Sequence, residues 1–394
     1  MQPNLFPAIL IAGPPNCGKS VLSYSLTQHL RQLNISHYLL RAAPDGEGNF
    51  VFDGPPGIVR GLRQGHKRPY SPAFISHTRR MIETRLLPLL VDVGGKPQGD
   101  DQFAILRACT HSIVLYRTQA ELQEWRNNLA GTHLQPIAEL HSSLTEPEQI
   151  EQTTPALSGV ITGLHRDEEK RILGPVFIEL VQRVAGICCY EPAYLESVHL
   201  SHAPFPWLLE RNLALQINPD RQDADGPGAA PRWNPADLTR LAQVVEAVQS
   251  QALYGRGPVW LAAMLAVHAL PAPYALYDAR YGWVNVPEVI DCKRSNVRVL
   301  VSPAPEIHAD WVSFKMKWGV IEPGPLRIRC LEGENGVVLS GKMPRWFFAA
   351  LARKHAPRCA WVGVDDPNLG RVVVVHSRTP ELLVGMTMPR AVSR

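Results

Sequence analysis

The stretch AILIAGPPNCGKSVLSYSLTQHL, residues 8–30, decides the fold of the first half of the chain. Its apolar start, Ala8–Ala12, predicts a buried strand, and the residues from Lys19 onward predict a helix. Between the two, Gly13–Ser20 matches the pattern G-x-x-x-x-G-K-S, whose backbone N–H groups cradle phosphates in a phosphate-binding loop (P-loop). We therefore expect five residues to bind ATP, the last of which also ligates Mg²⁺: Gly13, Asn16, Gly18, Lys19 and Ser20.

A site of this kind also needs an acidic residue at the end of a buried strand. The run LPLLVDV, Leu87–Val93, is followed by two glycines and places Asp92 at such an end. We expect Asp92 to join the Mg²⁺ shell, either directly or through a water molecule. An acid that merely caps a turn is the alternative.

Charged residues follow the second predicted strand. Asp45 and Glu47 lie in the glycine-rich run DGEG, where they could hold a second Mg²⁺ at the ATP site or accept the proton of a substrate hydroxyl. An ordinary solvated turn is the alternative. Four basic residues further along could close over phosphates as a lid or form plain surface: Arg60, Arg63, Lys67 and Arg68.

Short apolar runs alternate with helical stretches from Pro7 to about Ala185. The predicted strands are Ala8–Ala12, His37–Arg41, Leu87–Val93, Ser112–Arg117, Pro136–His141 and Ser158–Leu164. The predicted helices are Lys19–Leu33, Asp100–Cys109, Gln119–Leu129 and Gly174–Val184. This alternation predicts an α/β domain over residues 1–190, with a parallel sheet covered by helices on both faces.

The second half of the chain repeats itself after a polar, Gly- and Pro-rich linker at residues 218–234 and a helix predicted to carry Leu238 and Val248 on one face. GRGPVWLAAMLA at 255–266 aligns with GKMPRWFFAALA at 341–352, an offset of 341 − 255 = 86 residues. Each copy predicts a strand, a turn, a helix, a strand, a tight turn and a strand. We therefore expect two tandem small α/β units, 191–297 and 298–394, arranged as a pseudo-two-fold pair.

Within each copy an acid ends the second strand, Asp278 in the first and Asp366 in the second. His268 precedes Asp278 by ten residues and His355 precedes Asp366 by eleven, and we expect helix–strand geometry to bring each pair together. The alternatives are turn-capping acids, structural histidines and, for the shared tryptophans, core anchors. The copies differ, because the second has Asn368 at the position of Arg280 and adds His376 on its last strand.

Composition narrows the classes of partner. Lys and Arg number 40 against 36 Asp and Glu, so the net charge of +4 is too small for a nucleic-acid coat and we expect no DNA partner. No apolar run approaches the roughly 18 residues of a membrane span, so we expect no membrane association. Seven cysteines without a CxxC pair, and a start without a basic leader, predict a cytoplasmic protein with reduced thiols.

Both repeats resemble the CRISPR-associated Csx-three (Csx3) family, also classed as a ring nuclease. The runs that carry the resemblance are GVVLSGKMPRWFFAALARKH with VGVDDPNLGRVVVVHS, and YGRGPVWLAAMLAVHALPAPYALYDARYGWVNV. The first half, with PDGEGN, LPLLVDVGG and RACTH, is similar to the P-loop domain fused to that module in some bacteria.

This resemblance implies a fold related to the CRISPR-associated Rossmann-like sensors. It implies as ligand cyclic tetra-adenylate, a second messenger of type III CRISPR systems, which family members cleave to linear products with help from Mn²⁺. It also implies catalytic roles for Asp278, Arg280 and Asp366. From their spacing alone, His268 and His355 are further catalytic candidates, and His376 is a candidate metal ligand.

Three functions follow as hypotheses, each in a homo-oligomer that binds ATP and cyclic tetra-adenylate. In the first, the repeats cleave the messenger and the P-loop domain hydrolyses a nucleotide or gates assembly. In the second, the repeats only sense the messenger and switch on an ATPase or kinase. In the third, the protein is a scaffold whose repeats stack when the ligand binds.

Overall fold

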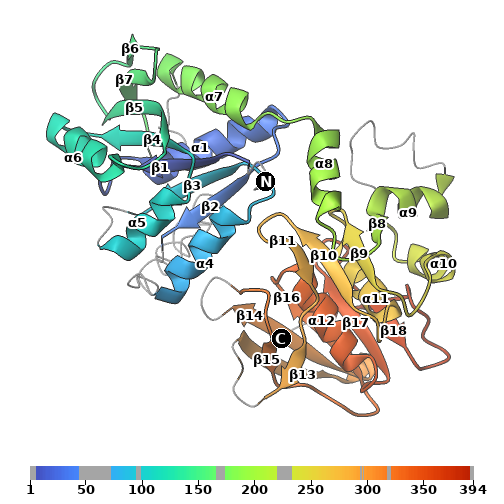
Figure 1. Ribbon diagram of the computed structural model, residues 1–394. Coiled ribbons are helices and arrows are strands. Elements are labelled where there is room, and N and C mark those ends of the chain that lie inside the picture. Colours follow the sequence, from blue (N-terminus) through green and yellow to red (C-terminus); the bar gives the residue numbers. More distant parts are fainter. Residues whose placement is uncertain are drawn as a thin grey trace. The chain divides into compact units, whose positions relative to one another are not determined.

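The chain folds into two compact units (Figure 1). The N-terminal unit comprises Met1–His199 with Ala279–Gly282, and the C-terminal unit comprises Leu200–Asp278 with Trp283–Arg394. The computed structural model describes residues 6–43, 72–94, 99–165, 174–219, 233–292, 295, 297–316 and 321–390. Over these ranges no helix combines the length and apolar character needed to cross a membrane. The limits expected at residues 190 and 297 remain predictions.

A seven-stranded sheet forms the core of the N-terminal unit. In spatial order its strands are β2 (Tyr38–Ala42), β3 (Leu89–Val93), β1 (Ala8–Ala12), β4 (His111–Tyr116), β5 (Gln135–Ser143), β7 (Leu157–Thr162) and β6 (Gln149–Gln152). All neighbouring pairs are parallel except β6 with β7. The helices are α1 (Lys19–Gln32), α4 (Pro72–Glu83), α5 (Asp100–Arg107), α6 (Gln119–Leu129), α7 (Pro175–Cys188) and α8 (Pro192–Ser201).

Strand β1 shows how the apolar pattern builds the two layers. Ile9 and Ile11 belong to a fully buried cluster with side chains of α1 and α7, whereas Leu10 belongs to a second cluster with side chains of α4, α5 and α6. Successive side chains of a strand point to opposite faces, so a continuous apolar run serves both layers. Burial of each such side chain contributes roughly 1.5–3 kcal/mol. The predicted parallel sheet with helices on both faces is confirmed.

The described residues of the C-terminal unit form three sheets. The first contains β8 (Trp207–Leu209), β9 (Gln251–Tyr254), β10 (Tyr274–Asp278) and β11 (Gly282–Asn285). The second contains β13 (Val297–Ala304), β14 (Ala309–Met316), β16 (Gly336–Gly341), β17 (Trp361–Asp366), β18 (Arg371–Ser377) and β19 (Thr387–Pro389), and the third pairs β12 (Val289–Asp291) with β15 (Leu326–Ile328). The helical segments are α9 (Glu210–Ile217), α10 (Asp237–Val244), α11 (Val259–His268), the short 3₁₀ helix η3 (Pro305–Ile307) and α12 (Arg345–His355).

The two repeated segments have the same strand order. Strands β8, β9, β10 and β11 are neighbours in that order, and so are β14, β16, β17 and β18. The first three strands of each set are parallel. The equivalent helices begin alike, because Pro258 caps α11 with φ −63° and ψ 158°, and Pro344 caps α12 with φ −62° and ψ 155°.

Helices α11 and α12 pack directly against each other, and each also contacts strands of the other repeat (Figure 1). Arg353 of α12 strengthens this contact by donating hydrogen bonds to the carbonyl oxygens of Ala266 (2.7 Å) and Ala272 (2.8 Å). The buried faces include Trp260 and Trp346, each 1% exposed. The repeats therefore share one core.

The helix after the linker is shorter than the apolar pattern predicts. Helix α10 ends at Val244, and Val248 lies beyond it with a φ of +61° and 59% exposure. The prediction that Val248 lies on the apolar helix face is wrong, because the backbone leaves the helical conformation at Val245, which is extended.

Candidate functional site

The P-loop lies between β1 and α1, at the edge of the sheet where parallel strands end. Three of its residues have positive φ: Gly13 (+146°), Asn16 (+63°) and Gly18 (+89°). Asn is among the few non-glycine residues that adopt such a conformation readily. These angles curl the chain from Ala12 back to Lys19, where α1 begins.

Neighbouring residues leave no room for larger side chains at the two glycines. A Cβ atom on Gly13 would lie 2.3 Å from the carbonyl oxygen of Leu115 in β4, and one on Gly18 would lie 2.9 Å from Cδ1 of Leu164. Since both positions also have positive φ, only glycine fits there without strain. The sequence pattern therefore corresponds to a loop held tightly against the strand next to β1.

The start of α1 is suited to an anion. Gly18 caps the helix in the left-handed conformation and has no side chain with which to cap the first N–H groups of this 14-residue helix. Uncapped amides at a helix N-terminus carry partial positive charge and bind phosphate. The loop residues present thus fit a phosphate chain.

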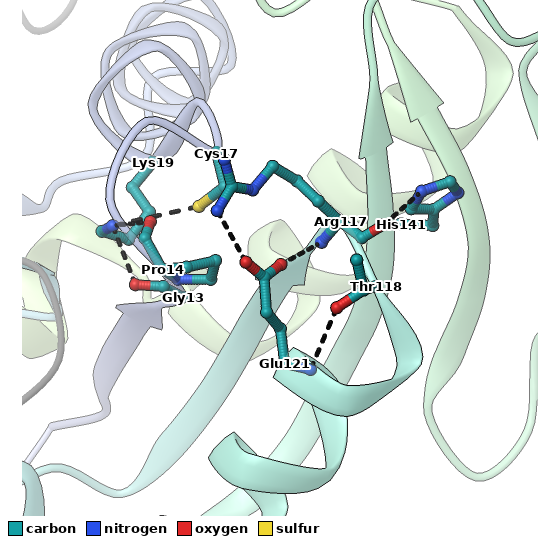
Figure 2. Close-up of polar contacts among 8 residues, drawn as sticks. All are labelled: Gly13, Pro14, Cys17, Lys19, Arg117, Thr118, Glu121 and His141. Atoms are coloured by element: carbon teal, nitrogen blue, oxygen red, sulfur yellow. Dashed lines mark hydrogen bonds and ion pairs between the residues drawn. The ribbon is translucent and has the colours of Figure 1, made fainter.

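Lys19 is folded back over the P-loop and is only 7% exposed (Figure 2). Its ammonium donates hydrogen bonds to the carbonyl oxygens of Gly13 (2.9 Å) and Pro14 (2.7 Å), and it lies 3.9 Å from Sγ of Cys17. Burial raises the pKa of the Cys17 thiol, against the opposing charges of Lys19 and Arg117. The thiol is therefore protonated, and the ammonium is held at the loop by carbonyl oxygens.

Ser20 and Asp92, the two predicted Mg²⁺ ligands, are brought together. A single nitrogen of Arg41, Nη1, lies 3.1 Å from Oγ of Ser20 and 3.1 Å from Oδ2 of Asp92. The Asp92 side chain is 5% exposed and forms an ion pair with this guanidinium. A hydroxyl and a carboxylate oxygen are donors that Mg²⁺ prefers. Arg41 was not expected from the sequence.

The ends of β4 and β5 add a second polar group beside the loop (Figure 2). Glu121 accepts hydrogen bonds from the backbone N–H (2.8 Å) and the guanidinium (2.6 Å) of Arg117, and its own N–H donates to Oγ1 of Thr118. Although burial raises the pKa of Glu121, the hydrogen bonds from Arg117 lower it overall. A ring nitrogen of His141 lies 3.0 Å from the Arg117 carbonyl oxygen. This group places a cation near Cys17, as Figure 2 shows.

Other predicted residues of the ATP site, Asp45 and Glu47, lie outside the described residues, and so do the four basic residues proposed as a lid.

In the first repeat, Asp278 ends β10 and Arg280 follows in the turn, with its guanidinium carbon 5.2 Å from the centre of the Tyr281 ring. Three aromatic rings lie next to this strand end. Tyr277 contacts Tyr254 and Trp283, with ring centres 4.9 Å and 5.6 Å apart. Aromatic faces of this kind are the usual stacking partners of nucleobases.

Two charged residues that the sequence did not suggest support the Gly255–Gly257 loop of the first repeat. Glu210 is 3% exposed, and its carboxylate accepts hydrogen bonds from the Gly257 N–H (2.5 Å) and from Nε1 of Trp233 (2.7 Å). Arg345 reaches across from α12 to the carbonyl oxygens of Gly255 (2.5 Å) and Tyr277 (3.1 Å). Burial lowers the pKa of Arg345, with Glu210 and Asp278 opposing.

In the second repeat, three donors engage the carboxylate of Asp366. Its Oδ1 accepts from the backbone N–H groups of Asn368 (2.9 Å) and Leu369 (3.3 Å), which caps the turn. Its Oδ2 accepts from Nε1 of Trp260 (2.9 Å), a buried residue of the first repeat. The carboxylate thus ties its own turn to the shared core. In this geometry Asp366 has the contacts of the turn-capping alternative, and Trp260 those of a core anchor.

The expected His–Asp pairs are not brought together. In a parallel β–α–β unit the end of the helix lies near the start of the next strand, whereas Asp278 and Asp366 lie at the far ends of β10 and β17. A ring nitrogen of His268 lies 2.8 Å from the carbonyl oxygen of Val245. A five-residue strand spans roughly 13 Å between its first and last residues, so the histidine stays distant from the acid.

His355 and His376 also lie away from Asp366. His355 is 1% exposed, with Nδ1 2.9 Å from the Leu351 carbonyl oxygen and Nε2 accepting from the Leu331 N–H at 3.2 Å. His376 pairs with Val362 near the start of β17, whereas Asp366 pairs with Arg371. Among the described residues no three His, Cys, Asp or Glu side chains gather as a metal site. His376 therefore has no manganese site around it in this part of the chain.

Comparison with known proteins bears on the end of the chain. Residues 322–389 match the family described as CRISPR-associated protein (Cas_csx3). No curated protein sequence matches the chain. Among solved structures, chloroplast FtsY from Physcomitrella patens is similar at 14% identity and a TM-score of 0.25, over 47% of this chain and 67% of its own. That likeness is too weak to support an argument. The C-terminal part of this protein, over β15 to β19, therefore carries a CRISPR-associated Csx3 domain.

Proposed function

We propose that the N-terminal unit binds ATP with Mg²⁺, and that the two repeats bind and cleave cyclic tetra-adenylate in type III CRISPR antiviral signalling. The observation that carries the proposal is the convergence of Lys19, Ser20 and Asp92 on one P-loop. The Csx3 match of the C-terminal part supports a role in CRISPR signalling, and cyclic tetra-adenylate is the messenger that we propose for it.

The nucleotide half rests on groups already in position. The uncapped amides of α1 and the loop would receive phosphate oxygens, and Lys19 would exchange its carbonyl partners for them. Ser20 and Asp92 would hold Mg²⁺, which neutralises the charge of the outer phosphates when bound. Glu121 keeps Arg117 paired beside the loop.

For the other half, we propose that the two repeats are tandem Rossmann-like units of one duplicated module. Their equal strand order and equal helix caps support this. The aromatic rings around Tyr277 would stack on adenines, and the Asp278–Arg280 turn would act on the ribose and phosphate.

The proposed reaction needs an acid and a cation at one turn. Asp278 would take the proton of a ribose 2′-hydroxyl as its oxygen attacks the adjacent phosphorus. The bond from phosphorus to the 5′-oxygen breaks, that oxygen takes up a proton, and a linear product with a 2′,3′-cyclic phosphate results. Arg280 would stabilise the charge that develops on the phosphate.

One observation favours a second candidate, in which the repeats bind the messenger without cleaving it and regulate an ATPase or kinase. Both oxygens of Asp366 are engaged in hydrogen bonds, and no predicted histidine lies beside its strand end. In the turn of the second repeat, the acid is thus engaged by groups of the fold.

Thin-layer separation distinguishes the candidates. Wild type, Asp278→Ala and Lys19→Ala are incubated with cyclic tetra-adenylate and Mn²⁺, and in parallel with ATP and Mg²⁺. We expect wild type and Lys19→Ala to yield linear product, and we expect Asp278→Ala to cleave cyclic tetra-adenylate at least 100-fold more slowly than wild type. No linear product from wild type would eliminate cleavage and leave the sensor, which requires ATP turnover to change when the messenger is added.

Calorimetry tests the binding claims separately. We expect wild type to release heat with ATP and Mg²⁺ and Lys19→Ala to show none, while Arg126→Gln serves as control. That substitution removes an ion pair with Glu139 that lies outside the P-loop contacts. Absence of heat with wild type would overturn the nucleotide site, and absence of heat with cyclic tetra-adenylate would overturn the messenger site.

A further inference from the structure

Arg41 holds the two oxygens that the proposed function assigns to Mg²⁺. Its Nη1 atom lies at equal distances, 3.1 Å, from Oγ of Ser20 and from Oδ2 of Asp92. We propose that Arg41 is a resident cation which Mg²⁺ must displace, so that metal binding at this site depends on the nucleotide. This inference rests on the proposed ATP site and adds a residue to it.

The sheet itself sets this contact. Strands β2 and β3 are parallel neighbours, and their register pairs Arg41 with Asp92. The Asp92 side chain is 5% exposed and that of Arg41 20%, so water screens their attraction little. A buried carboxylate that loses a charged partner carries a large desolvation cost. In the resting protein, the ion pair with the Arg41 guanidinium offsets this desolvation cost.

Metal and guanidinium compete for the same electron pairs. Mg²⁺ binds oxygen at 2.0–2.1 Å and requires a near-ideal octahedron. An N–H donor positioned between the serine and aspartate oxygens directs its hydrogens at the lone pairs that a metal bridging them would use. Both cations cannot occupy this position, so Arg41 must withdraw before Ser20 and Asp92 ligate a metal.

The competition gives the site an order of events. When Mg²⁺ binds alone, it only replaces the guanidinium of Arg41, so the gain in binding free energy is small. A triphosphate brings additional oxygen ligands and negative charge, which favour the metal and provide another partner for the released guanidinium. Lys19 is likewise held by protein carbonyls in this state, so Lys19 and Arg41 both exchange partners when phosphates arrive.

The first test measures metal binding without nucleotide. The full chain is titrated with Mn²⁺ alone, and the unbound ion is read by electron paramagnetic resonance. We expect wild type and Arg126→Gln to bind weakly and equally, and Arg41→Gln to bind at least tenfold more tightly. The double variant Arg41→Gln with Asp92→Asn should lose this gain. Equal affinities of wild type and Arg41→Gln would overturn the inference, and so would a gain that survives Asp92→Asn.

A second measurement uses wild type only and does not depend on how the variants fold. The side-chain Nε–H resonance of Arg41 is followed by NMR with arginine-labelled protein. We expect it to shift when Mg²⁺ is added with a non-hydrolysable ATP analogue, and to stay unchanged with Mg²⁺ alone. If the resonance does not shift with the nucleotide, although calorimetry shows that ATP binds, the proposed role of Arg41 is overturned and the ATP site is not. Absent heat with ATP instead overturns the ATP site, while the Mn²⁺ titration still decides the role of Arg41.

Discussion

Asp92 of the N-terminal unit and Asp366 of the C-terminal unit occupy similar places, since each lies near the end of a buried strand that has a parallel neighbour. Their partners differ. Asp92 is paired with the guanidinium of Arg41, whereas Asp366 accepts from two amides of its own turn and from the indole of Trp260. A strand-end acid is suited to a ligand where its partner can be exchanged, and to stability where its partners belong to the fold.

The same substitution at both acids gives the largest expected contrast. We expect Asp92→Asn to weaken ATP·Mg²⁺ binding about 100-fold, or about 2.8 kcal/mol, because an amide lacks the charge that a metal requires. Asp366→Asn should leave ATP binding unchanged and lower the melting temperature. Calorimetry and thermal unfolding measure the two effects. Equal losses of ATP affinity in both variants would contradict the distinction between them.

The two equivalent tryptophans sharpen the comparison inside the C-terminal unit. Each is 1% exposed, but only the indole N–H of Trp260 has a hydrogen-bond partner among the described residues. We expect Trp260→Phe to cost about 1–3 kcal/mol more stability than Trp346→Phe, because it leaves a partly buried oxygen of Asp366 without its donor. Urea unfolding of both variants measures the difference. Equal losses of stability would mean that the hydrogen bond from the Trp260 indole to Asp366 does not stabilise the fold.

A smaller effect is expected from buried histidines. Burial lowers the pKa of His376 and of His355 below the ordinary value. Their neutral forms are therefore favoured in the folded state, and the stability that this provides is present above about pH 6.5 and falls as the unfolded chain takes up protons at lower pH. His376→Gln should reduce the loss of stability between pH 7 and pH 5, by at most about 1.4 kcal/mol per pH unit. Melting temperatures across this range test it, and parallel curves for variant and wild type would contradict it.

The sequence predicted the P-loop well because its requirements are local. Gly13 and Gly18 are dictated by backbone angles and close neighbours, and Lys19 follows directly. Asp92 was found because a strand end is visible as the end of an apolar run. Arg41 was missed, since its importance depends on the register of β2 against β3, and Asp92 is 51 residues away along the chain.

The histidine pairs failed for a reason of topology. Spacing along the chain suggested proximity, but β–α–β geometry places the end of α11 and the end of β10 at opposite edges of the sheet. Glu210 and Arg345 could not be predicted for another reason. Both hydrogen-bond to backbone groups of the Gly255–Gly257 loop, and a pattern of side chains in the sequence does not indicate such contacts.

The hydrogen bonds from Arg353 and the packing of α11 on α12 mean that each repeat covers buried surface of the other. A fragment cut at residue 297 would lose the Asp366 partner of Trp260 and expose the carbonyl oxygens of Ala266 and Ala272 to which Arg353 donates. Joining both copies in one polypeptide removes any dependence of this pairing on protein concentration. Single repeats prepared for binding studies would therefore associate with one another or aggregate, so both repeats should be kept in one polypeptide.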